Sequence, residues 1–577
     1  MSRRRILIWI AIVSLPAGLI GSGARPALAA PVTDAVVGPP CGEAQLDAAL
    51  ATLQSSLSGG TITFQCGGPV TIALTSPKLI IAPVTIDGAD QIILTGANAT
   101  DILHVKVNAT LTLLHLGLSH GQVDHDGGAI FNSGRLIIDH ANLESNDASG
   151  HKGGALYNEG LATISNSRFF ANRSLAGWGG AIYSVGIMTI TNSSFISNLA
   201  LMGGAIVNDN AILDMRGSSF SGNSASGAGG AIVTFGTLRL DQTSFDNNSS
   251  LSGGAINSEV SLSIRGGRFY SNTASVYGGG AVETDGQANI TGATFLSNTA
   301  PAGGGGAIHV GRTLTVTDSD FEEGTAGIGG ALDSDLGAQL TIQNSRFISN
   351  SSNSEGGAIH NQGQLVVDGS IFTGNSAPFS GGGGLAQDSA SAAWIMNSTF
   401  AANGALSGGG LFLSGTVTLS NTTFSANNAY GGGGVLAQSG VLTVTNGTFS
   451  GNQAPGGHAI ISFSGATVRL KNTILAGSPS DNCSGMIVSL GHNLDDGNTC
   501  GLGAAGDLTA TDPLLGPLAD NGGPTATHAL LPASPAINHG DDDGCPPTDQ
   551  RGYLRLGGCD IGAFEYAFRL LVPLVRR

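Results

Sequence analysis

The chain has 577 residues, of which 91 are glycine and 11% are charged, and its formal net charge is −17. An acidic surface of this kind disfavours binding to nucleic acid and to anionic membrane surfaces. Because aliphatic residues and phenylalanine recur throughout the chain, the glycine content indicates many turns rather than disorder.

The N-terminus has the pattern of a secretory signal. Three arginines at positions 3–5 precede an apolar run over 6–20, and the Ala-Leu-Ala at 27–29 fits a small-x-small cleavage site. We therefore predict a Sec-type signal peptide over 1–29 and a secreted or cell-surface protein. The alternative is a retained membrane anchor, for which the apolar run is short.

The region 30–120 is expected to form an N-terminal cap and the first, irregular coils. A helix is predicted over 43–57, because Leu46, Ala49, Leu50 and Leu53 share one face. Short segments rich in β-branched residues follow it and indicate strands. These segments are 61–64, 70–74, 79–86, 92–94, 102–107 and 111–118.

Fourteen Gly-Gly steps, 23 to 27 residues apart, dominate the next region, 121–475. Their first glycines are Gly127, Gly153, Gly179, Gly203, Gly229, Gly253, Gly279, Gly305, Gly329, Gly356, Gly383, Gly409, Gly433 and Gly456. A period of this length is typical of a solenoid, a propeller or a repeat array. Glycine at these steps allows the chain to turn tightly into the next strand.

Equivalent positions of successive units repeat their chemistry. The residue three after the first glycine is nearly always aliphatic, so we predict that it faces the core. The next residue varies freely, from Phe131 to Glu283 to His360, and we predict that it faces solvent because strand side chains alternate between the two faces.

A phenylalanine closes almost every unit, and an asparagine follows it by three residues in eleven of twelve units, with Gly324 as the exception. Stacked about 4.8 Å apart, the rings would form an internal aromatic column. The amides would form a hydrogen-bonded ladder that satisfies a buried turn.

Three short strands in about 25 residues predict an all-β fold, a right-handed parallel β-helix of the pectin-lyase-like kind. We expect a helical cap at its N-terminus and a disulfide-locked cap at its C-terminus. The leucine-rich repeat pattern is absent, and propeller blades need about 40 residues. Fourteen coils give a rod of roughly 65 Å.

All six cysteines lie outside the regular coils, and in an exported chain they suggest disulfides. The simplest of the fifteen possible pairings joins neighbours along the chain. These pairs are Cys41–Cys66, Cys483–Cys500 and Cys545–Cys559. Locked ends would protect the open strand edges of a solenoid.

The variable column contains Glu283, His309, Asp333 and His360 in four successive units. Neighbours about 5 Å apart would couple their titrations, and they could bind a metal or serve as acid and base. The alternative, which we favour, is a surface column that happens to carry four polar residues.

A second acidic group, Asp541, Asp542 and Asp543, stands beside Cys545. It could hold Ca²⁺, although a solvated acidic turn is the favoured interpretation. Apart from this calcium we expect no cofactor. A charge network of Asp549, Arg551, Asp560 and Glu565 is expected to hold the C-terminal cap, with His528 as a structural residue.

The Gly-Gly-Ala-Ile and Phe-x-x-Asn pair resembles the repeats of polymorphic outer membrane proteins and related bacterial β-helix adhesins. The segment from Cys41 to Phe64 is similar to the start of exported β-helix proteins named for a Cys-Ser-Leu-Arg-Glu-Ala motif, here reduced to Cys-Gly-Glu-Ala. The region 476–566 resembles the choice-of-anchor Q domain. That resemblance rests on 512–518, 520–525, 527–532, 534–537, 549–552 and 560–565.

These resemblances imply an exported bacterial surface protein that has a variable attachment device and no known catalytic activity. We therefore expect a non-enzymatic β-helix protein that binds extracellular glycans or cell surfaces and is attached to the cell envelope through its C-terminus. The tail at 567–577 is either an attachment signal or a final strand on the cap. Its oligomeric state is left open.

The alternative function is a polysaccharide lyase or glycoside hydrolase that acts on an extracellular acidic polysaccharide, since parallel β-helices host such enzymes. Three of the four polygalacturonase-like strings are absent, and adjacent aspartates occur only near the C-terminus. Even repeat spacing also leaves little room for the long loops that build a catalytic groove.

Overall fold

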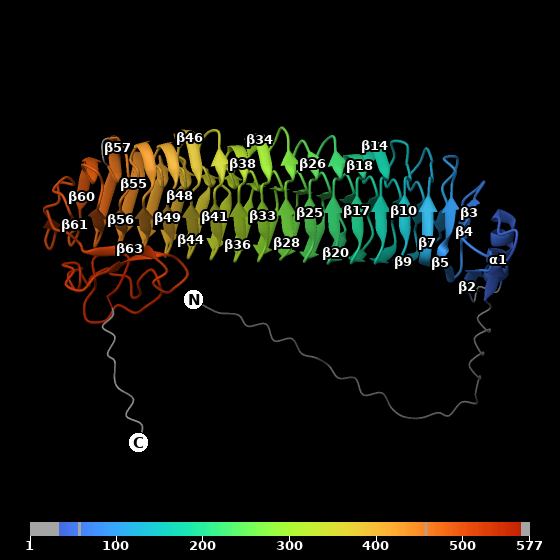
Figure 1. The fold of residues 1–577 in the computed structure, drawn as a ribbon. Helices are drawn as coiled ribbons and strands as arrows, with labels where there is room; N and C mark the ends of the chain where they lie inside the picture. Colours follow the sequence, from blue (N-terminus) through green and yellow to red (C-terminus); the bar gives the residue numbers. More distant parts are fainter. Residues whose placement is uncertain (1–33, 56–58, 456–457, 567–577) are drawn as a thin grey trace, which may run out of the picture.

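The computed structural model describes residues 34–55, 59–455 and 458–566, which form one long rod (Figure 1). The expected signal peptide at 1–29, Gly456 and the tail at 567–577 lie outside the described residues. The rod is a right-handed parallel β-helix, as predicted, and its successive coils pair in parallel along the whole length. No helix in the described part of the chain is long and apolar enough to cross a membrane.

The N-terminal end begins with a strand, a helix and irregular coils. The elements are β1 (Ala35–Val37), α1 (Glu43–Ser55), β2 (Gly60–Phe64), β3 (Val70–Ala73), β4 (Lys78–Ile80), β5 (Val84–Thr95), β6 (Leu103–Val105) and β7 (Thr110–Ser119). The predicted apolar face of α1 is buried against the first coils, so the helix caps the core. The strand expected over 79–86 is instead two strands, and the second continues through 92–94.

Each regular coil contains three strands that follow the predicted pattern. The strands after the Gly-Gly turn are β8 (Ile130–Asn132), β11 (Leu156–Asn158), β15 (Ile182–Ser184), β19 (Ile206–Asn208), β23 (Ile232–Thr234), β27 (Ile256–Ser258), β31 (Val282–Thr284), β35 (Ile308–Val310), β39 (Leu332–Ser334), β43 (Ile359–Asn361), β47 (Leu385–Gln387) and β51 (Leu411–Leu413). The next strands are β9 (Arg135–Asp139), β12 (Leu161–Ser165), β16 (Met188–Thr191), β20 (Ile212–Arg216), β24 (Thr237–Asp241), β28 (Ser261–Arg265), β32 (Gln287–Thr291), β36 (Thr313–Thr317), β40 (Gln339–Gln343), β44 (Gln364–Asp368), β48 (Ala392–Met396) and β52 (Thr416–Ser420).

The third strands carry the phenylalanines, except for the first and the last, which have Leu143 and Leu475 at that position. They are β10 (Asn142–Glu144), β13 (Arg168–Phe170), β17 (Ser194–Ile196), β21 (Ser219–Ser221), β25 (Ser244–Asp246), β29 (Arg268–Tyr270), β33 (Thr294–Leu296), β37 (Asp320–Glu322), β41 (Arg346–Ile348), β45 (Ile371–Thr373), β49 (Thr399–Ala401), β53 (Thr423–Ser425), β56 (Thr448–Ser450) and β58 (Ile474–Ala476).

A fourth strand, which the sequence did not indicate, forms a separate 11-stranded sheet. Its members are β14 (Arg173–Trp178), β18 (Leu199–Met202), β22 (Ser224–Ala225), β26 (Ser249–Ser250), β30 (Thr273–Ala274), β34 (Thr299–Gly304), β38 (Thr325–Ile328), β42 (Ser351–Ser352), β46 (Ser376–Gly381), β50 (Gly404–Ser407) and β54 (Asn428–Gly431). We call it the second sheet. Several of its strands have only two residues and are rich in serine, so they lack the β-branched pattern that would predict them.

The core consists of the predicted columns. The aliphatic residues after the Gly-Gly turns are fully buried, and twelve phenylalanine rings stack with centroids 4.4 to 4.9 Å apart. The asparagine ladder is also present: Asn248 Nδ2 donates to Asn272 Oδ1 at 3.0 Å and to the carbonyl oxygen of Phe220 at 3.1 Å.

The Gly-Gly turns require glycine, as predicted. At Gly305 φ is +69°, and a Cβ atom would lie 2.0 Å from a backbone oxygen of the same turn. In three coils the predicted position of the first turn glycine is wrong by one residue. The glycines with positive φ in these coils are Gly382, Gly408 and Gly432. Runs of three or four glycines hide the phase there, and a glycine replaces the usual alanine that follows the pair.

The C-terminal part closes the rod and then folds back along its side. The elements are β55 (Val435–Thr445), β57 (Ile460–Lys471), β59 (Cys483–Gly485), β60 (Ile487–Ser489), β61 (Leu494–Asp495), β62 (Leu508–Thr509), β63 (Leu515–Ala519) and β64 (Thr527–Leu530). Coils continue through β62, and residues 510–566 form a lobe beside the third strands, drawn in red below the rod (Figure 1). The last coils and this lobe together are the C-terminal cap.

The three predicted disulfides are present. Cys41–Cys66 ties the segment before α1 to the segment after β2, Cys483–Cys500 crosses the last coils, and Cys545–Cys559 lies within the lobe. Two bridges therefore lock the ends of the solenoid and the third locks the lobe.

Candidate functional site

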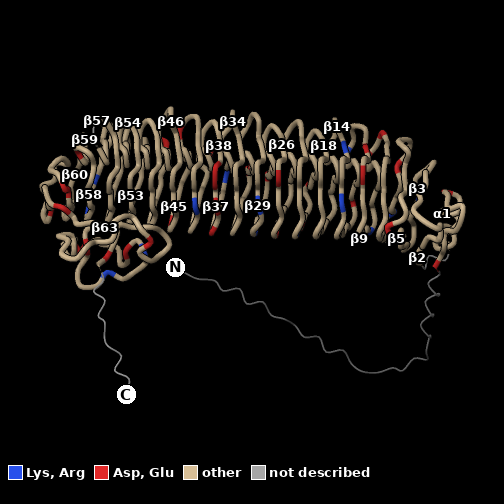
Figure 2. The backbone as a smooth tube through the Cα atoms, viewed as in Figure 1, with Lys and Arg blue, Asp and Glu red and all other residues tan. Residues whose placement is uncertain are grey.

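Charged residues are sparse along the rod (Figure 2), and the predicted polar column joins four titratable residues of its strands by direct contacts. Glu283, His309, Asp333 and His360 lie on β31, β35, β39 and β43, in direct register from coil to coil. The parallel pairing of consecutive coils places each side chain on its neighbour. We call these four residues the charged column.

The four side chains are joined in one chain of contacts. His309 Nδ1 is 2.9 Å from Glu283 Oε1, and His309 Nε2 is 3.3 Å from Asp333 Oδ2. The other oxygen of Asp333 is 2.7 Å from His360 Nδ1. Carboxylate and imidazole thus alternate along the rod.

Three further acids, which the sequence analysis missed, complete the network. Asp335 Oδ1 is 3.4 Å from His309 Nε2, and Asp388 Oδ1 is 3.5 Å and Glu355 Oε2 3.9 Å from His360 Nε2. Asp335 and Asp388 stand two residues after the variable position of their coils. That spacing could have predicted these two acids as partners of the column, because the turn after the first strand carries an acid in several other coils as well.

The prediction that this column faces solvent is wrong. Glu283 and Asp333 are each 9% exposed and His360 is 2% exposed. The chain turn just before each Gly-Gly step passes over the side chain of the next coil: a Cβ atom on Gly304 would lie 1.9 Å from Asp333 Oδ2. The alternation of side chains along a strand predicts on which face of the sheet a residue lies, but it does not predict which other segment covers that residue.

Burial and pairing together set the protonation of the column. Burial alone lowers the pKa of His309, but hydrogen bonds to Asp333 and Glu283 outweigh it and raise the pKa to about 11. Burial is likewise outweighed at His360, where Asp333 and Asp388 raise the pKa to about 9. At Asp333 burial is opposed by the two imidazoles, and its pKa is lowered.

At neutral pH both imidazoles are therefore cations, and the lowered pKa of Asp333 keeps the carboxylate between them ionised. Such a network stabilises its coils and has few free lone pairs to offer a substrate. Glu355, His360 and Asp388 place one ligand-type atom each within 4.8 Å of one another. Because Nδ1 of His360 already contacts Asp333, metal binding there would require loss of the imidazolium proton.

The same column carries aromatic side chains nearer the N-terminus. Phe131, Tyr157 and Tyr183 stack at 5.0 and 5.4 Å, and the Lys152 ammonium lies 4.1 Å from the centre of the Tyr183 ring. Burial and a hydrogen bond to Asp209 raise the pKa of Tyr183. Fully buried valines continue the cluster, so this part of the column is a packed structural element.

The predicted calcium ligands serve the fold in the structure. Asp541 Oδ2 is 3.1 Å from Lys471 Nζ, and Asp542 Oδ1 accepts the backbone N–H of Cys559 at 2.8 Å. Asp543 donates its backbone N–H to Asp541 Oδ1 at 3.0 Å. The contact between Asp541 and Lys471 joins the lobe to the coils, and the other two contacts lie within the lobe.

The expected charge network of the lobe is present and includes one residue that the sequence analysis missed. Arg551 pairs with Asp549 at 2.6 Å, and Arg555, the added residue, pairs with Glu565 at 3.1 Å. Burial raises the pKa of Asp560. His528 is structural, because Nδ1 contacts the carbonyl oxygen of Gly516 at 2.8 Å and Nε2 lies 3.0 Å from Ser425 Oγ.

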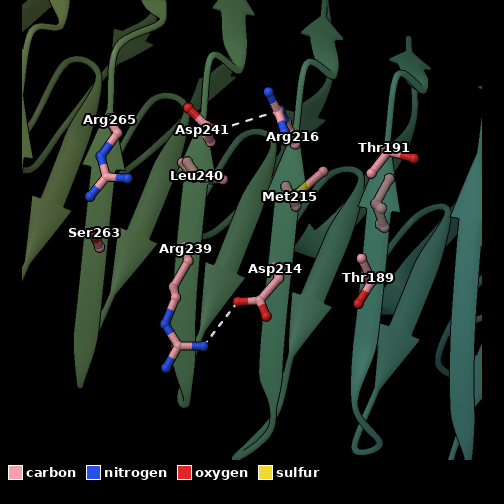
Figure 3. A pocket seen from close by; sticks show the side chains of 11 residues that line it. Thr189, Thr191, Asp214, Met215, Arg216, Arg239, Leu240, Asp241, Ser263 and Arg265 are labelled. Carbon is pink, nitrogen blue, oxygen red and sulfur yellow. Dashed lines mark hydrogen bonds and ion pairs between the residues drawn. The ribbon is translucent and has the colours of Figure 1, made fainter.

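A shallow depression of about 370 Å³ lies across β16, β20, β24 and β28 (Figure 3). Its charged side chains pair with each other: Arg239 with Asp214 at 3.0 Å and Arg216 with Asp241 at 3.5 Å. These exposed pairs add little stability, and they neutralise most of the charge that an acidic ligand would meet.

The second sheet presents the clearest exposed surface of another kind. Large apolar side chains lie on its strands or up to three residues after them, and we call them together the apolar stripe, although the coils of β22, β34, β38 and β42 contribute no member. It consists of Leu175, Leu199, Leu201, Leu251, Val276, Tyr277, Phe379, Leu406 and Tyr430. Phe379 is 73% exposed and Tyr430 is 76% exposed, and together with Leu406 they occupy three successive coils.

Comparison with known proteins supports the fold. The family described as "Right handed beta helix region" matches residues 337–495, and the "Chlamydia polymorphic membrane protein" repeat matches residues 217–234. No curated protein matches the chain.

Two solved structures show a distant similarity at 11% sequence identity. The A-module of the mannuronan C-5 epimerase AlgE6 from Azotobacter vinelandii has a TM-score of 0.23, over 77% of this chain and 94% of that one. Tailspike protein 3 of bacteriophage CBA120 has a TM-score of 0.22, over 76% of this chain and 59% of that one. Similarity at this level carries no information on ligand or activity.

Proposed function

We propose that this chain is a non-enzymatic, exported cell-surface protein that binds extracellular glycans along the apolar stripe and is attached to the cell envelope through its C-terminal region. The apolar stripe is the observation that carries the proposal. Clustered exposed apolar groups mark binding surfaces on soluble proteins, and tyrosine and phenylalanine are enriched where partners bind. The strongest cluster in the stripe is Phe379, Leu406 and Tyr430, in three successive coils.

The surroundings of the stripe favour a glycan as the ligand. Serine residues lie on other strands of the same sheet, where Ser249 Oγ donates to Ser224 Oγ at 3.1 Å. A sugar presents both an apolar C–H face, which can lie on an aromatic ring, and hydroxyls, which can exchange hydrogen bonds with serine. The sheet is also long and repeats about every 4.8 Å, so it suits an extended polymer.

Export and attachment rest on other features. Three disulfides fit an oxidising, extracellular compartment, and the expected signal peptide agrees with that location. The C-terminal lobe packs on the side of the coils near the end of the rod. An attachment made beyond residue 566 would then leave most of the second sheet accessible.

A glycan array with the protein lacking residues 1–29 tests the proposal. We expect binding to at least one extended glycan, and at least a tenfold loss of affinity, about 1.4 kcal/mol, in the triple variant Phe379→Ser, Leu406→Ser, Tyr430→Ser. The matched control is Trp394→Ser, an exposed aromatic on β48 outside the second sheet. Absence of any bound glycan, or equal affinity of the two variants, would overturn the proposal.

The second candidate, an enzyme acting on an acidic polysaccharide, rests on the charged column, which holds imidazole between carboxylates but keeps these groups buried and paired with one another. Incubation with polygalacturonate and alginate, followed by size analysis, separates the two candidates. We expect no depolymerisation. Cleavage that disappears in His309→Gln would establish the enzyme instead.

A further inference from the structure

A cluster of metal-ligand residues lies near the N-terminal end of the rod, away from the apolar stripe and the charged column. Asp101 lies two residues before the start of β6, His104 lies on β6, and His125 belongs to the turn between β7 and β8 in the next coil. Each offers one ligand atom, and the three atoms lie within 4.8 Å of one another. Residues from two coils thus converge on one point.

The three side chains are held in place by other groups. The Asp101 side chain is 2% exposed, contacts His104 Nε2, and accepts a hydrogen bond from the Thr100 hydroxyl at 3.3 Å. The ring of His104 packs on Phe131, with centroids 5.8 Å apart. Buried outer partners of this kind fix the orientation of metal ligands.

His125 is oriented in the same manner from the solvent side. Its Nδ1 lies 3.0 Å from the carbonyl oxygen of Asp126. If Nδ1 donates its proton to that oxygen, Nε2 keeps a free lone pair for a ligand. The rings of His104 and His125 meet edge to face at 6.1 Å, which brings both imidazoles to the same opening.

The cluster lines an open cleft of about 600 Å³. Asn98, Gln122, Asp124 and Ser149 complete its wall with polar groups. Three protein ligands beside open space match the arrangement in which zinc keeps a fourth position for water or a ligand oxygen. Two imidazoles and one carboxylate suit Zn²⁺ and neighbouring divalent transition metals, whereas Ca²⁺ and Mg²⁺ prefer oxygen ligands alone.

We propose that Asp101, His104 and His125 bind a divalent transition metal ion of the zinc class, with an open coordination position facing the cleft. This site is independent of the proposed glycan-binding stripe. The ion would bridge two consecutive coils, and its open position would accept water or an oxygen of a bound ligand.

The same part of the rod provides a matched control. His115 and His140 stack at 5.2 Å, and they lie beside Asp87 at 3.4 Å and Asp139 at 2.9 Å. This second histidine pair also spans two coils and also has carboxylate partners. Among the described residues, however, no three ligand atoms around this pair lie within 4.8 Å of one another. Removing His140 should therefore leave a specific site intact.

Isothermal titration of tag-free, chelator-treated protein with ZnCl₂ tests the site, and Co²⁺ substitution gives an absorption spectrum that reports ligand number. We expect one Zn²⁺ per chain. His125→Ala, which removes an exposed side chain without loss of core packing, should weaken binding by at least roughly 100-fold, the upper end of the effect of outer partners. Asp101→Asn should do the same, and His140→Ala should not change the affinity.

Circular dichroism of each variant establishes that the coils remain folded. No zinc binding, an affinity unchanged in His125→Ala, or an equal loss in His140→Ala would overturn the proposal. These outcomes are distinct from failure of glycan binding, because the zinc titration contains no glycan.

Discussion

Removal of one carboxylate from the charged column should destabilise the middle of the rod. Asp333→Asn is the sharpest perturbation, because Asp333 contacts His360 Nδ1 at 2.7 Å and His309 Nε2 at 3.3 Å. With pKa values of about 9 and about 11, both imidazoles are cations at neutral pH. The amide would leave two buried cations with one shared counter-ion fewer.

Breaking a buried ion pair by removing one partner costs about 3–5 kcal/mol, and we expect a loss of unfolding free energy in that range. Asp335→Asn is the matched control, since it removes the same charge from the same His309 Nε2 at 3.4 Å. The Asp335 side chain is 58% exposed, so its loss should cost at most about 1 kcal/mol.

The stabilisation should depend on pH with a definite sign. A histidine whose pKa is raised by folding stabilises fully below its ordinary value of 6.5 and loses the contribution as pH rises through about 9 for His360 and about 11 for His309. Asp333 has a lowered pKa, so its contribution is present above 3.8 and is lost as the pH falls further. The difference between Asp333→Asn and the unchanged protein should therefore be largest between pH 3.8 and pH 6.5, where both contributions are fully present, and should decline as the pH rises further.

Hydrogen exchange measured by mass spectrometry is the suitable assay, because each coil of a solenoid depends mainly on its neighbours. Peptides within 279–388 should lose protection in Asp333→Asn, while peptides within 179–250 should not. Equal protection in Asp333→Asn and Asp335→Asn would refute the reasoning. So would an NMR titration in which His309 and His360 titrate near 6.5.

Two further predictions concern the repeat itself. Asn272→Ala removes a ladder amide that donates to a Phe245 carbonyl at 2.9 Å, and it should cost about 1–3 kcal/mol in thermal unfolding, whereas the exposed Asn289→Ala should have almost no effect. Gly305→Ala should impair folding more severely than Gly292→Ala: both residues have positive φ, but a Cβ atom clashes with backbone only at Gly305, and similar soluble yields of the two variants would contradict this account.

The sequence predicts the fold well because repetition removes ambiguity. A single phenylalanine has many possible positions, but twelve at one phase, such as Phe295 and Phe321, can all be buried only in one column. The predicted position of the turn glycine was wrong where the repeat pattern is interrupted, in the glycine runs at Gly382 and Gly408. There every residue is the same, so no pattern distinguishes the one with positive φ.

The candidate sites were predicted less well, because they depend on contacts that no local pattern records. The charged column is buried since Gly304 passes over it from the previous coil, which the two-residue period of a strand does not indicate. The same limit applies to the lobe. Thr423 is fully buried under the lobe, and its hydroxyl donates a 2.7 Å hydrogen bond to Oε1 of Gln550, which is far away in the chain.

One structural column links most of the unusual chemistry of this chain. His104 is in register with Phe131, and the same line of side chains continues through the stacked tyrosines and the buried valines to the charged column. A solenoid permits this variation because each side chain must suit only the coil above and the coil below.

The column also lies where new chemistry is least costly for the fold. Its side chains are separated from the aliphatic core by the strand itself, and the turn before the Gly-Gly step of the previous coil covers them, as Gly304 covers Asp333. Where that turn is glycine, as at Gly278, the column can hold an imidazole such as that of His309, because a Cβ atom there would lie 2.6 Å from it. Where the turn leaves a cleft, as beside His104 and His125, the same position opens to solvent and to an ion. The size of the covering residue therefore determines whether a coil buries its polar side chain or exposes it. On this basis, Gly278→Ala should displace His309 without altering zinc binding at the other end of the column.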